Sequence, residues 1–205
     1  MAPIPITMIT GYLGAGKTSF LNHLLHLPAV AARTPALIIN EFGSMNVDGG
    51  LVPDGAYRTF ELNKGSVFCI CIKTDFIKTL TTIADEVRPD MLIVEATGIA
   101  DPCDLADFLD VPTLLGRFET QANVCLVDAA NFSKVAPFMQ AAQNQVLWAD
   151  GLVLNKSDLV SEDELVRVEA SLRRLNPDVP LTRASYGRIP EAFLSGLVHR
   201  PRRGA

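Results

Sequence analysis

The chain has 205 residues, of which 48% are hydrophobic and 20% charged, and its net charge is −5. That length suits one α/β domain with a substantial core, and the acidic balance argues against general binding to nucleic acids or acidic membrane surfaces. No apolar run approaches the length of a membrane span, and the first residues lack the basic segment and cleavage site of a signal peptide, so we expect a cytoplasmic protein. In that compartment the four cysteines are expected to be ligands, reactive groups or core residues, and not disulfides.

Short apolar runs alternate with helical stretches along the chain. Strands are predicted over residues 4–10, 36–40, 57–62, 91–95, 123–128, 151–155 and 180–184. Helices are predicted over residues 20–27, 75–87, 161–175 and 189–197, the third opening on a Ser-x-x-Glu capping box. This alternation indicates an α/β fold in three layers, with a mostly parallel central sheet and helices on both faces. We expect one domain over residues 1–197 and a basic, frayed tail over residues 198–205.

A glycine-rich loop with the pattern Gly-x4-Gly-Lys-Thr joins the first predicted strand to the first predicted helix. Strand, glycine loop, Lys-Thr and helix form the context in which this pattern binds phosphate. The glycines let successive backbone N–H groups point into one concavity, and the helix adds the positive end of its dipole. Lys17 is expected to reach the β- and γ-phosphates, and the Thr18 hydroxyl to bind Mg²⁺. The candidate nucleotide-binding residues in this loop are Gly11, Gly14, Ala15, Gly16, Lys17, Thr18 and Ser19.

A second motif, Asn155-Lys156-Ser157-Asp158, follows the strand predicted over residues 151–155. Ligands bind at that end of the strands in open α/β sheets. A buried carboxylate at Asp158 accepts two hydrogen bonds, from N1–H and the 2-amino group of guanine. It is left unpaired against adenine, so it selects GTP over ATP. The stem of Lys156 is expected to lie along the base, and Asn155 to fasten this loop to the phosphate loop.

The two motifs and the residues between them resemble the CobW-type GTPases, a family linked to metal insertion and metal chaperoning. The resemblance extends over residues 4–190 and rests on an ordered series of segments. These are residues 11–18, 40–43, 47–49, 95–98, 100–102, 148–158 and 175–177. The resemblance implies a P-loop NTPase fold and a Mg²⁺-dependent GTP hydrolase of low intrinsic rate. The family usually adds a C-terminal domain, which we expect to be absent from this chain.

Further site residues follow from the resemblance and from their places at the ends of strands. Glu95 stands in for the Walker-B aspartate and is expected to hold Mg²⁺ through water or to orient the attacking water. The Gly98 N–H is expected to meet the γ-phosphate, and Glu41 and Asp48 to order around the metal when that phosphate is present. The expected catalytic set is Lys17, Glu95 and Glu41, and the expected Mg²⁺ set is Thr18, Glu95 and Asp48.

The metal motif of the family, Cys-x-Cys-Cys, is only partly present, as the pair Cys69 and Cys71. In extended backbone, residues two apart face the same side, so both sulfurs are able to bind one Zn²⁺ or Co²⁺ ion. Two thiolates do not complete a four-coordinate site, and water, Glu41, Cys103 or a partner chain must supply the other ligands. The alternative is a pair of partly buried cysteines that act as small hydrophobic residues. Cys125 lies inside an apolar strand and is expected in the core.

Two functions of different classes remain open. In the first, metal chaperoning or insertion, GTP hydrolysis changes the metal affinity of the cysteine pair and releases zinc or cobalt to a client metalloprotein. In the second, a GTP-dependent switch activates a metalloenzyme or corrinoid protein and carries no metal itself. A small-molecule phosphotransferase is weaker, because no acceptor pocket is visible beside the guanine motif. The expected partners are GTP, GDP and the client; a homodimer stays open, and neither nucleic acid nor membrane is expected. Arg33, Arg58 and Arg117 are unranked candidates for an activating arginine.

Overall fold

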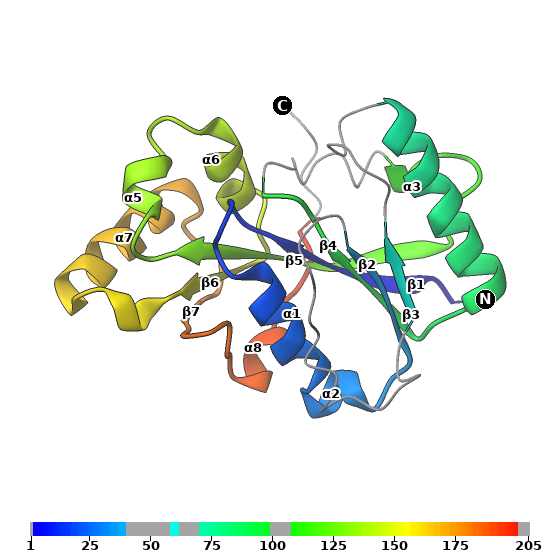
Figure 1. Ribbon diagram of the computed structural model, residues 1–205, viewed down its shortest axis with the longest axis horizontal. Coiled ribbons are helices and arrows are strands. Elements are labelled where there is room, and N and C mark those ends of the chain that lie inside the picture. The colour runs from blue at the N-terminus through cyan, green and yellow to red at the C-terminus, as the bar shows by residue number, and fades with distance from the viewer. Residues whose placement is uncertain (1, 40–57, 62–69, 99–107, 201–205) are drawn as a thin grey trace.

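The computed structural model describes residues 2–39, 58–61, 70–98 and 108–200. Within these residues a seven-stranded sheet runs through the centre of the molecule (Figure 1), and its strands have the order β3-β2-β4-β1-β5-β6-β7. All neighbouring strands pair in parallel. The strands are β1 (Ile4–Thr10), β2 (Pro35–Ile39), β3 (Arg58–Glu61), β4 (Met91–Glu95), β5 (Phe118–Asp128), β6 (Gly151–Asn155) and β7 (Leu181–Arg183).

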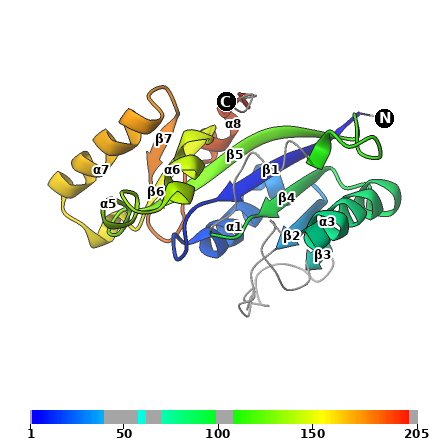
Figure 2. The ribbon, with the colours of Figure 1, turned by 90° about the horizontal axis from the view of Figure 1, so that it is seen from above.

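Helices cover both faces of the sheet, as the two views in Figures 1 and 2 show. On one face lie α1 (Lys17–Leu25), α2 (Pro28–Ala31) and α8 (Glu191–Ser195). On the other face lie α3 (Ile70–Thr82), its π-helical continuation (Ile83–Val87), α5 (Phe132–Val135), α6 (Gln140–Leu147) and α7 (Glu162–Leu175). The predicted three-layer α/β fold with a parallel sheet is therefore confirmed. Among the described residues, no helix combines the length and apolar character needed to cross a bilayer.

The central strands are apolar on both sides because each side meets a layer of helices. All five residues of β2, β4 and β6 are buried. Successive side chains of β1 enter opposite layers: Ile9 packs in the cluster that contains Phe20 of α1, whereas Ile6 packs in the cluster that contains Phe76 of α3. This double packing holds β1, and the loop that follows it, in the middle of the molecule.

Several predicted boundaries were wrong, chiefly where the apolar pattern is weak. Helix α1 begins at Lys17, inside the glycine motif, and α3 begins at Ile70, five residues before the prediction. Strand β5 begins at Phe118 and not at residue 123, because its first half is partly exposed and lacks a continuous apolar run. Helices α2, α5 and α6 were not predicted, since their short sequences carry little apolar periodicity. The N-cap half of the predicted capping box is confirmed, because the Ser161 hydroxyl accepts the backbone N–H of Glu164 at 3.3 Å.

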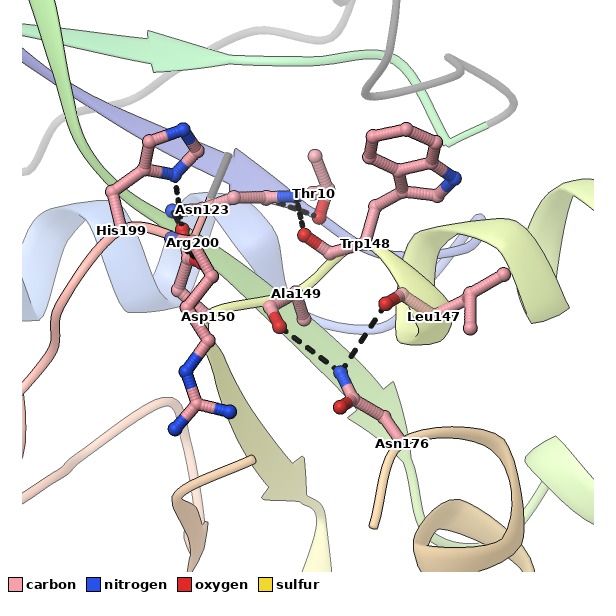
Figure 3. Close-up of polar contacts among 9 residues, drawn as sticks. All are labelled: Thr10, Asn123, Leu147, Trp148, Ala149, Asp150, Asn176, His199 and Arg200. Carbon is pink, nitrogen blue, oxygen red and sulfur yellow. Dashed lines mark hydrogen bonds and ion pairs between the residues drawn. The ribbon is translucent and has the colours of Figure 1, made fainter. Parts of the chain in front are cut away.

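The end of the described chain is held in place, so the tail expected to fray from residue 198 does not begin there (Figure 3). Asp150, directly before β6, is 4% exposed, and its two carboxylate oxygens anchor this segment. Oδ1 accepts the backbone N–H of Arg200 at 2.9 Å, and Oδ2 lies 2.8 Å from Nδ1 of His199. Oδ2 also accepts the backbone N–H of Asn123 on β5 at 2.8 Å. Residues 201–205 lie outside the described part of the chain.

A second buried polar residue, Asn176, fixes the turn that joins α6 to β6 (Figure 3). Its Nδ2 donates to the backbone carbonyls of Val146 and Ala149, both at 3.0 Å, and to that of Leu147 at 3.3 Å. Carbonyl groups at the end of a helix have no partner inside the helix. One asparagine therefore satisfies the end of α6, which explains why this residue type follows α7.

Replacement of Asn176 by leucine should lower the free energy of unfolding by about 2 kcal/mol, because it keeps the side-chain volume and leaves buried carbonyls unpaired. Chemical denaturation measures this change. The matched control is Gln140→Ala on the exposed side of α6, where a change within about 0.5 kcal/mol is expected. If both substitutions change the free energy of unfolding equally, the hydrogen bonds of Asn176 do not contribute specially to stability.

Candidate functional site

The glycine loop lies at the carboxyl end of β1, and β1 lies between β4 and β5 in the middle of the sheet. Gly11, Gly14 and Gly16 have φ values of 138°, 73° and 96°. Side chains rarely adopt such values, so the curled backbone requires glycine at these positions. Gly16 is also the N-cap of α1, and the first N–H groups of a helix have no partner inside it. The loop has the backbone geometry that an anion-binding site needs.

Lys17 places a positive charge against this loop. The residue is 4% exposed, and its Nζ donates to the carbonyl oxygen of Gly11 at 3.1 Å. An ammonium group has three donors, and this bond uses one of them. The bond holds the side chain folded back across the loop, where the remaining donors suit phosphate oxygens.

The structure brings together two of the predicted Mg²⁺ ligands. Thr18 lies in the first turn of α1, Glu95 is the last residue of β4, and the Thr18 hydroxyl donates to Oε1 of Glu95 at 3.0 Å. Glu95 is 1% exposed. A hydroxyl and a carboxylate are hard oxygen ligands of the kind that Mg²⁺ prefers, so these residues fit the ion. Glu41 and Asp48 lie outside the described residues.

Asn155 joins the phosphate loop to two other loops. Its Nδ2 donates to the carbonyl oxygen of Ala15 at 2.9 Å, and its Oδ1 accepts the backbone N–H of Gly187 at 2.9 Å. A Cβ atom at Gly16 would lie 2.4 Å from Nδ2 of Asn155, and one at Gly187 would lie 2.6 Å from the backbone nitrogen of Phe20. The geometry therefore places the predicted link between the Asn-Lys-x-Asp motif and the phosphate loop where the sequence suggested it.

Lys156 forms an ion pair that the sequence did not indicate. Its Nζ lies 2.7 Å from Oδ2 of Asp128, the last residue of β5. Burial alone acts to raise the pKa of Asp128, but hydrogen bonds from Lys156, Asn131 and the backbone of Ala130 outweigh it and hold that pKa below its ordinary value. Asp128 thus fixes the direction of the Lys156 stem, which the sequence had placed along a base.

Asp158 is exposed, contrary to the buried carboxylate that the sequence argument assumed. It lies in a short 3-10 helix, Ser157–Leu159, at the carboxyl edge of the sheet. A carboxylate in water discriminates weakly between bases, so selection requires that the bound base itself cover Asp158.

The loop after β7 is a part of the site that the sequence reading missed. Ser157 donates its hydroxyl to the carbonyl of Ala184 at 2.8 Å and lies 3.2 Å from the Ser185 hydroxyl. Tyr186 and Gly187 follow, both with positive φ. The available signal was the Ser-Tyr-Gly run directly after the strand predicted over residues 180–184, because serine and glycine favour turns and this turn lies at the ligand-binding edge.

Gly98, the predicted γ-phosphate contact, lies against the phosphate loop. The residue is buried, and a Cβ atom there would lie 2.7 Å from the backbone nitrogen of Leu13 and 2.6 Å from its side chain. Its carbonyl oxygen accepts a hydrogen bond from the buried Gln145 of α6. The sequence reading did not single out Gln145.

The three candidate arginines lie at the opposite edge of the sheet. Arg33 shortly precedes β2, Arg58 is the first residue of β3, and Arg117 directly precedes β5. Arg117 also pairs with Asp85. Because all strands are parallel, their first residues lie at the edge away from the phosphate loop. None of these three arginines is placed to act on a bound phosphate in this chain.

The structure tests the cysteine hypothesis only in part. Cys71 lies in the first turn of α3, so the assumption that its backbone is extended was wrong. Cys69 and Cys103 lie outside the described residues, among which no group of three or more His, Cys, Asp or Glu side chains forms a metal cluster. Cys125 is 1% exposed, and burial raises the pKa of its thiol to about 12, although a hydrogen bond with Thr10 and the charge of Lys17 oppose the shift. It is a core residue, as predicted.

The lowered pKa of Asp128 makes a pH-dependent contribution to stability. A carboxylate with a lower pKa in the folded state stabilises the fold above its unfolded pKa, about 3.9, and loses that effect as pH falls through the folded value. The free-energy difference between the wild type and Asp128→Asn should therefore be largest near neutral pH and should shrink below about pH 4. Urea denaturation over a pH series measures it. A difference that does not vary with pH would contradict the assignment.

Comparisons with known proteins agree with this geometry. The family model described as CobW/HypB/UreG, nucleotide-binding domain, matches residues 5–183. The chain is 34% identical over 202 residues to the zinc chaperone YjiA of Escherichia coli, covering 95% of this chain and 61% of that protein. It is 32% identical over 225 residues to the zinc chaperone CobW of a Sinorhizobium species, covering 95% of this chain and 62% of the relative. The chain thus spans about three fifths of these relatives.

Solved structures show the same fold. The crystal structure of Zn(II)-bound YjiA GTPase from E. coli has a TM-score of 0.70 at 27% identity, with 100% of this chain and 68% of that chain covered. HypB from Archaeoglobus fulgidus, a hydrogenase maturation factor, has a TM-score of 0.58 at 15% identity, covering 89% and 81%, and supports the fold alone. Because the family model matches residues 5–183, most of its length, the chain belongs to the CobW/HypB/UreG nucleotide-binding domain family.

Proposed function

We propose that this protein binds GTP with Mg²⁺, hydrolyses it, and uses the reaction to deliver zinc to a client metalloprotein. The observation that carries the proposal is the pair of bonds from Asn155 to the phosphate loop and to the Gly187 loop. These bonds bring a phosphate-binding element and a base-reading element into one site. A site with both elements recognises a nucleoside triphosphate at its two ends.

The protein need not form a covalent bond with the nucleotide, because phosphoryl transfer is catalysed mainly by positioning the reactants and by stabilising charge. Lys17 binds the β- and γ-phosphates and offsets their negative charge. Thr18 and Glu95 would hold Mg²⁺, which would supply positive charge against the phosphates. Gly98 offers its N–H to the γ-phosphate, and Glu41 is the proposed partner of Glu95 in orienting water. Arg33, Arg58 and Arg117 lie at the far edge, so none of these three supplies an activating group; we propose that a partner supplies it.

The base-reading role of Asp158 is tested by changing the base along with the side chain. Asn at this position offers an amide donor, and xanthine carries a carbonyl acceptor where guanine carries the 2-amino group. Asp158→Asn should weaken GTP binding about 100-fold and strengthen XTP binding, because a charged hydrogen-bond pair is lost and a neutral one gained. Calorimetry with GTP, ATP and XTP in the presence of Mg²⁺ measures this exchange.

Two further variants complete that experiment. Asp163→Asn, on the exposed start of α7, is the matched control and should leave all three affinities unchanged. Lys17→Ala should weaken every triphosphate alike, since it acts on the phosphates and not on the base. A wild type that prefers ATP, or an affinity that Lys17→Ala leaves intact, would refute the proposed site.

The proposed cargo follows from the relatives. Two are named zinc chaperones, the YjiA structure is described as Zn(II)-bound, and a Dictyostelium discoideum relative at 25% identity is named a zinc-regulated GTPase metalloprotein activator. We assign the zinc to Cys69 and Cys71 with further ligands from outside the pair. We propose that a partner chain or another segment supplies the remaining zinc ligands. The reduced Cys125 and the use of GTP suit a cytoplasmic protein.

Zinc affinity should depend on both the cysteines and the nucleotide. The double substitution Cys69→Ser, Cys71→Ser should lower zinc affinity by about 100-fold, whereas the core substitution Cys125→Ala should not change it. In the wild type the zinc affinity should differ between a GTP analogue and GDP, because binding free energies of coupled ligands are reciprocal. Competition with a fluorescent chelator measures both. A wild type that binds no zinc in either state would favour the metal-free switch.

A further inference from the structure

A buried glutamine ties the end of β4 to helix α6. Gln145 is fully buried, with 0% exposure, and its Nε2 donates to the carbonyl oxygen of Gly98 at 3.1 Å. The two residues are 47 positions apart in the sequence and lie in different elements. A buried amide donor is a costly group to place in a core without a purpose, because it must be satisfied. Its partner here is a backbone group next to the proposed γ-phosphate site.

Gly98 is held from two sides. On one side lies the phosphate loop, whose Leu13 leaves no room for even a methyl group at Gly98. On the other side Gln145 binds the carbonyl that follows the same Cα atom. The N–H of Gly98 belongs to the peptide plane before that Cα atom, and it moves when the backbone of Gly98 moves. The bond from Gln145 and the contact with Leu13 together restrict that backbone, and with it the range of directions open to the N–H.

Hydrogen bonds hold the end of helix α6, which carries Gln145; Figure 3 shows those of Leu147, Trp148 and Ala149. Directly after Gln145, the carbonyls of Val146 and Ala149 are bound by Asn176. The carbonyl of Trp148 accepts Nδ2 of Asn123 at 3.1 Å, and Oδ1 of Asn123 accepts the hydroxyl of Thr10 on β1 at 3.0 Å. The end of α6 is thus bonded to both central strands. Through Gln145, the backbone of Gly98 is therefore bonded to a helix that is itself bonded to the sheet.

We propose that Gln145 is a positioning residue for the γ-phosphate: it holds Gly98 so that the backbone N–H points at that group. The proposal rests on the proposed GTP hydrolysis. Donors fixed in advance stabilise developing charge without reorganising during the reaction. GDP lacks the γ-phosphate, so its binding does not use this donor. Gln145 therefore contributes to telling the triphosphate from the diphosphate, and not to nucleotide affinity in general.

The test compares Gln145→Met with the wild type, because methionine keeps the length of the side chain and removes the donor. We expect the affinity for a non-hydrolysable GTP analogue to fall about fivefold and the single-turnover hydrolysis rate about tenfold, less than the ~100-fold loss typical of deleting a direct donor. The GDP affinity should stay within about twofold of the wild type. Gln145→Glu is the second variant, since it keeps the shape and, when ionised, offers only acceptors.

The matched control is Gln143→Met on the same helix. Gln143 donates its Nε2 to the carbonyl of Ala136 at 2.6 Å, away from Gly98. This variant should keep the wild-type ratio of GTP-analogue to GDP affinity and the wild-type rate. GDP binding by every variant also shows that each is folded.

Three outcomes would overturn the proposal. If both Gln145 variants bind and hydrolyse GTP like the wild type, the contact has no role in the reaction. If they lose GTP-analogue and GDP affinity equally, the role is structural only. In either case the proposed function stands, because the wild type hydrolyses GTP in the same assay. If the wild type itself binds no guanine nucleotide, the proposed function fails and the assignment of Gln145 fails with it.

Discussion

One side-chain amide holds the candidate site together. The carboxamide of Asn155 donates to Ala15 in the phosphate loop and accepts from Gly187 in the loop after β7. An amide can do both because it carries a donor and an acceptor on one rigid plane. Gly16 leaves the space that this amide needs, and Gly187 leaves the space that lets its loop approach the backbone of Phe20 on α1. Three loops from distant parts of the sequence thereby share a single fixed point.

Charged residues and buried structural anchors both lie near the carboxyl ends of the central strands. Lys17, Glu95 and Asp128 bring charges to the ends of β1, β4 and β5, where they can meet a ligand. Asp150 precedes β6, whose first residue Gly151 pairs with Val124, the partner of Ile9 on β1. This buried carboxylate binds the protein itself and so supports the strands that carry the site.

The sequence predicted those parts of the site whose geometry is encoded locally. Gly11, Gly14 and Gly16 specify a backbone conformation, and the residue type of Cys125 within an apolar run places it in the core, so both could be read directly. The bond between Asn155 and the phosphate loop was inferred from the motif alone.

The parts that were missed depend on which elements become neighbours. The pairing of Lys156 with Asp128 requires β5 and β6 to be adjacent, and the contact of Gln145 with Gly98 requires α6 to pack beside the end of β4. Neither requirement is visible in a local pattern. Asp158 was predicted to be buried, but it is exposed in the protein alone. Only a bound base would cover it, and the base is part of the ligand. The helical backbone at Cys71 was missed because the apolar spacing before residue 75 is too irregular to mark the start of a helix.

The clamp of Asp150 on His199 and Arg200 fixes the last described residues of the chain against the folded body. This clamp lies beside the central strands, because Asp150 binds Asn123 on β5 and Asn123 binds Thr10, the residue directly before the glycine loop. A fluorescent protein or an affinity handle joined directly behind Arg200 would therefore start close to the nucleotide site, and a long linker would be needed to keep it clear of that site.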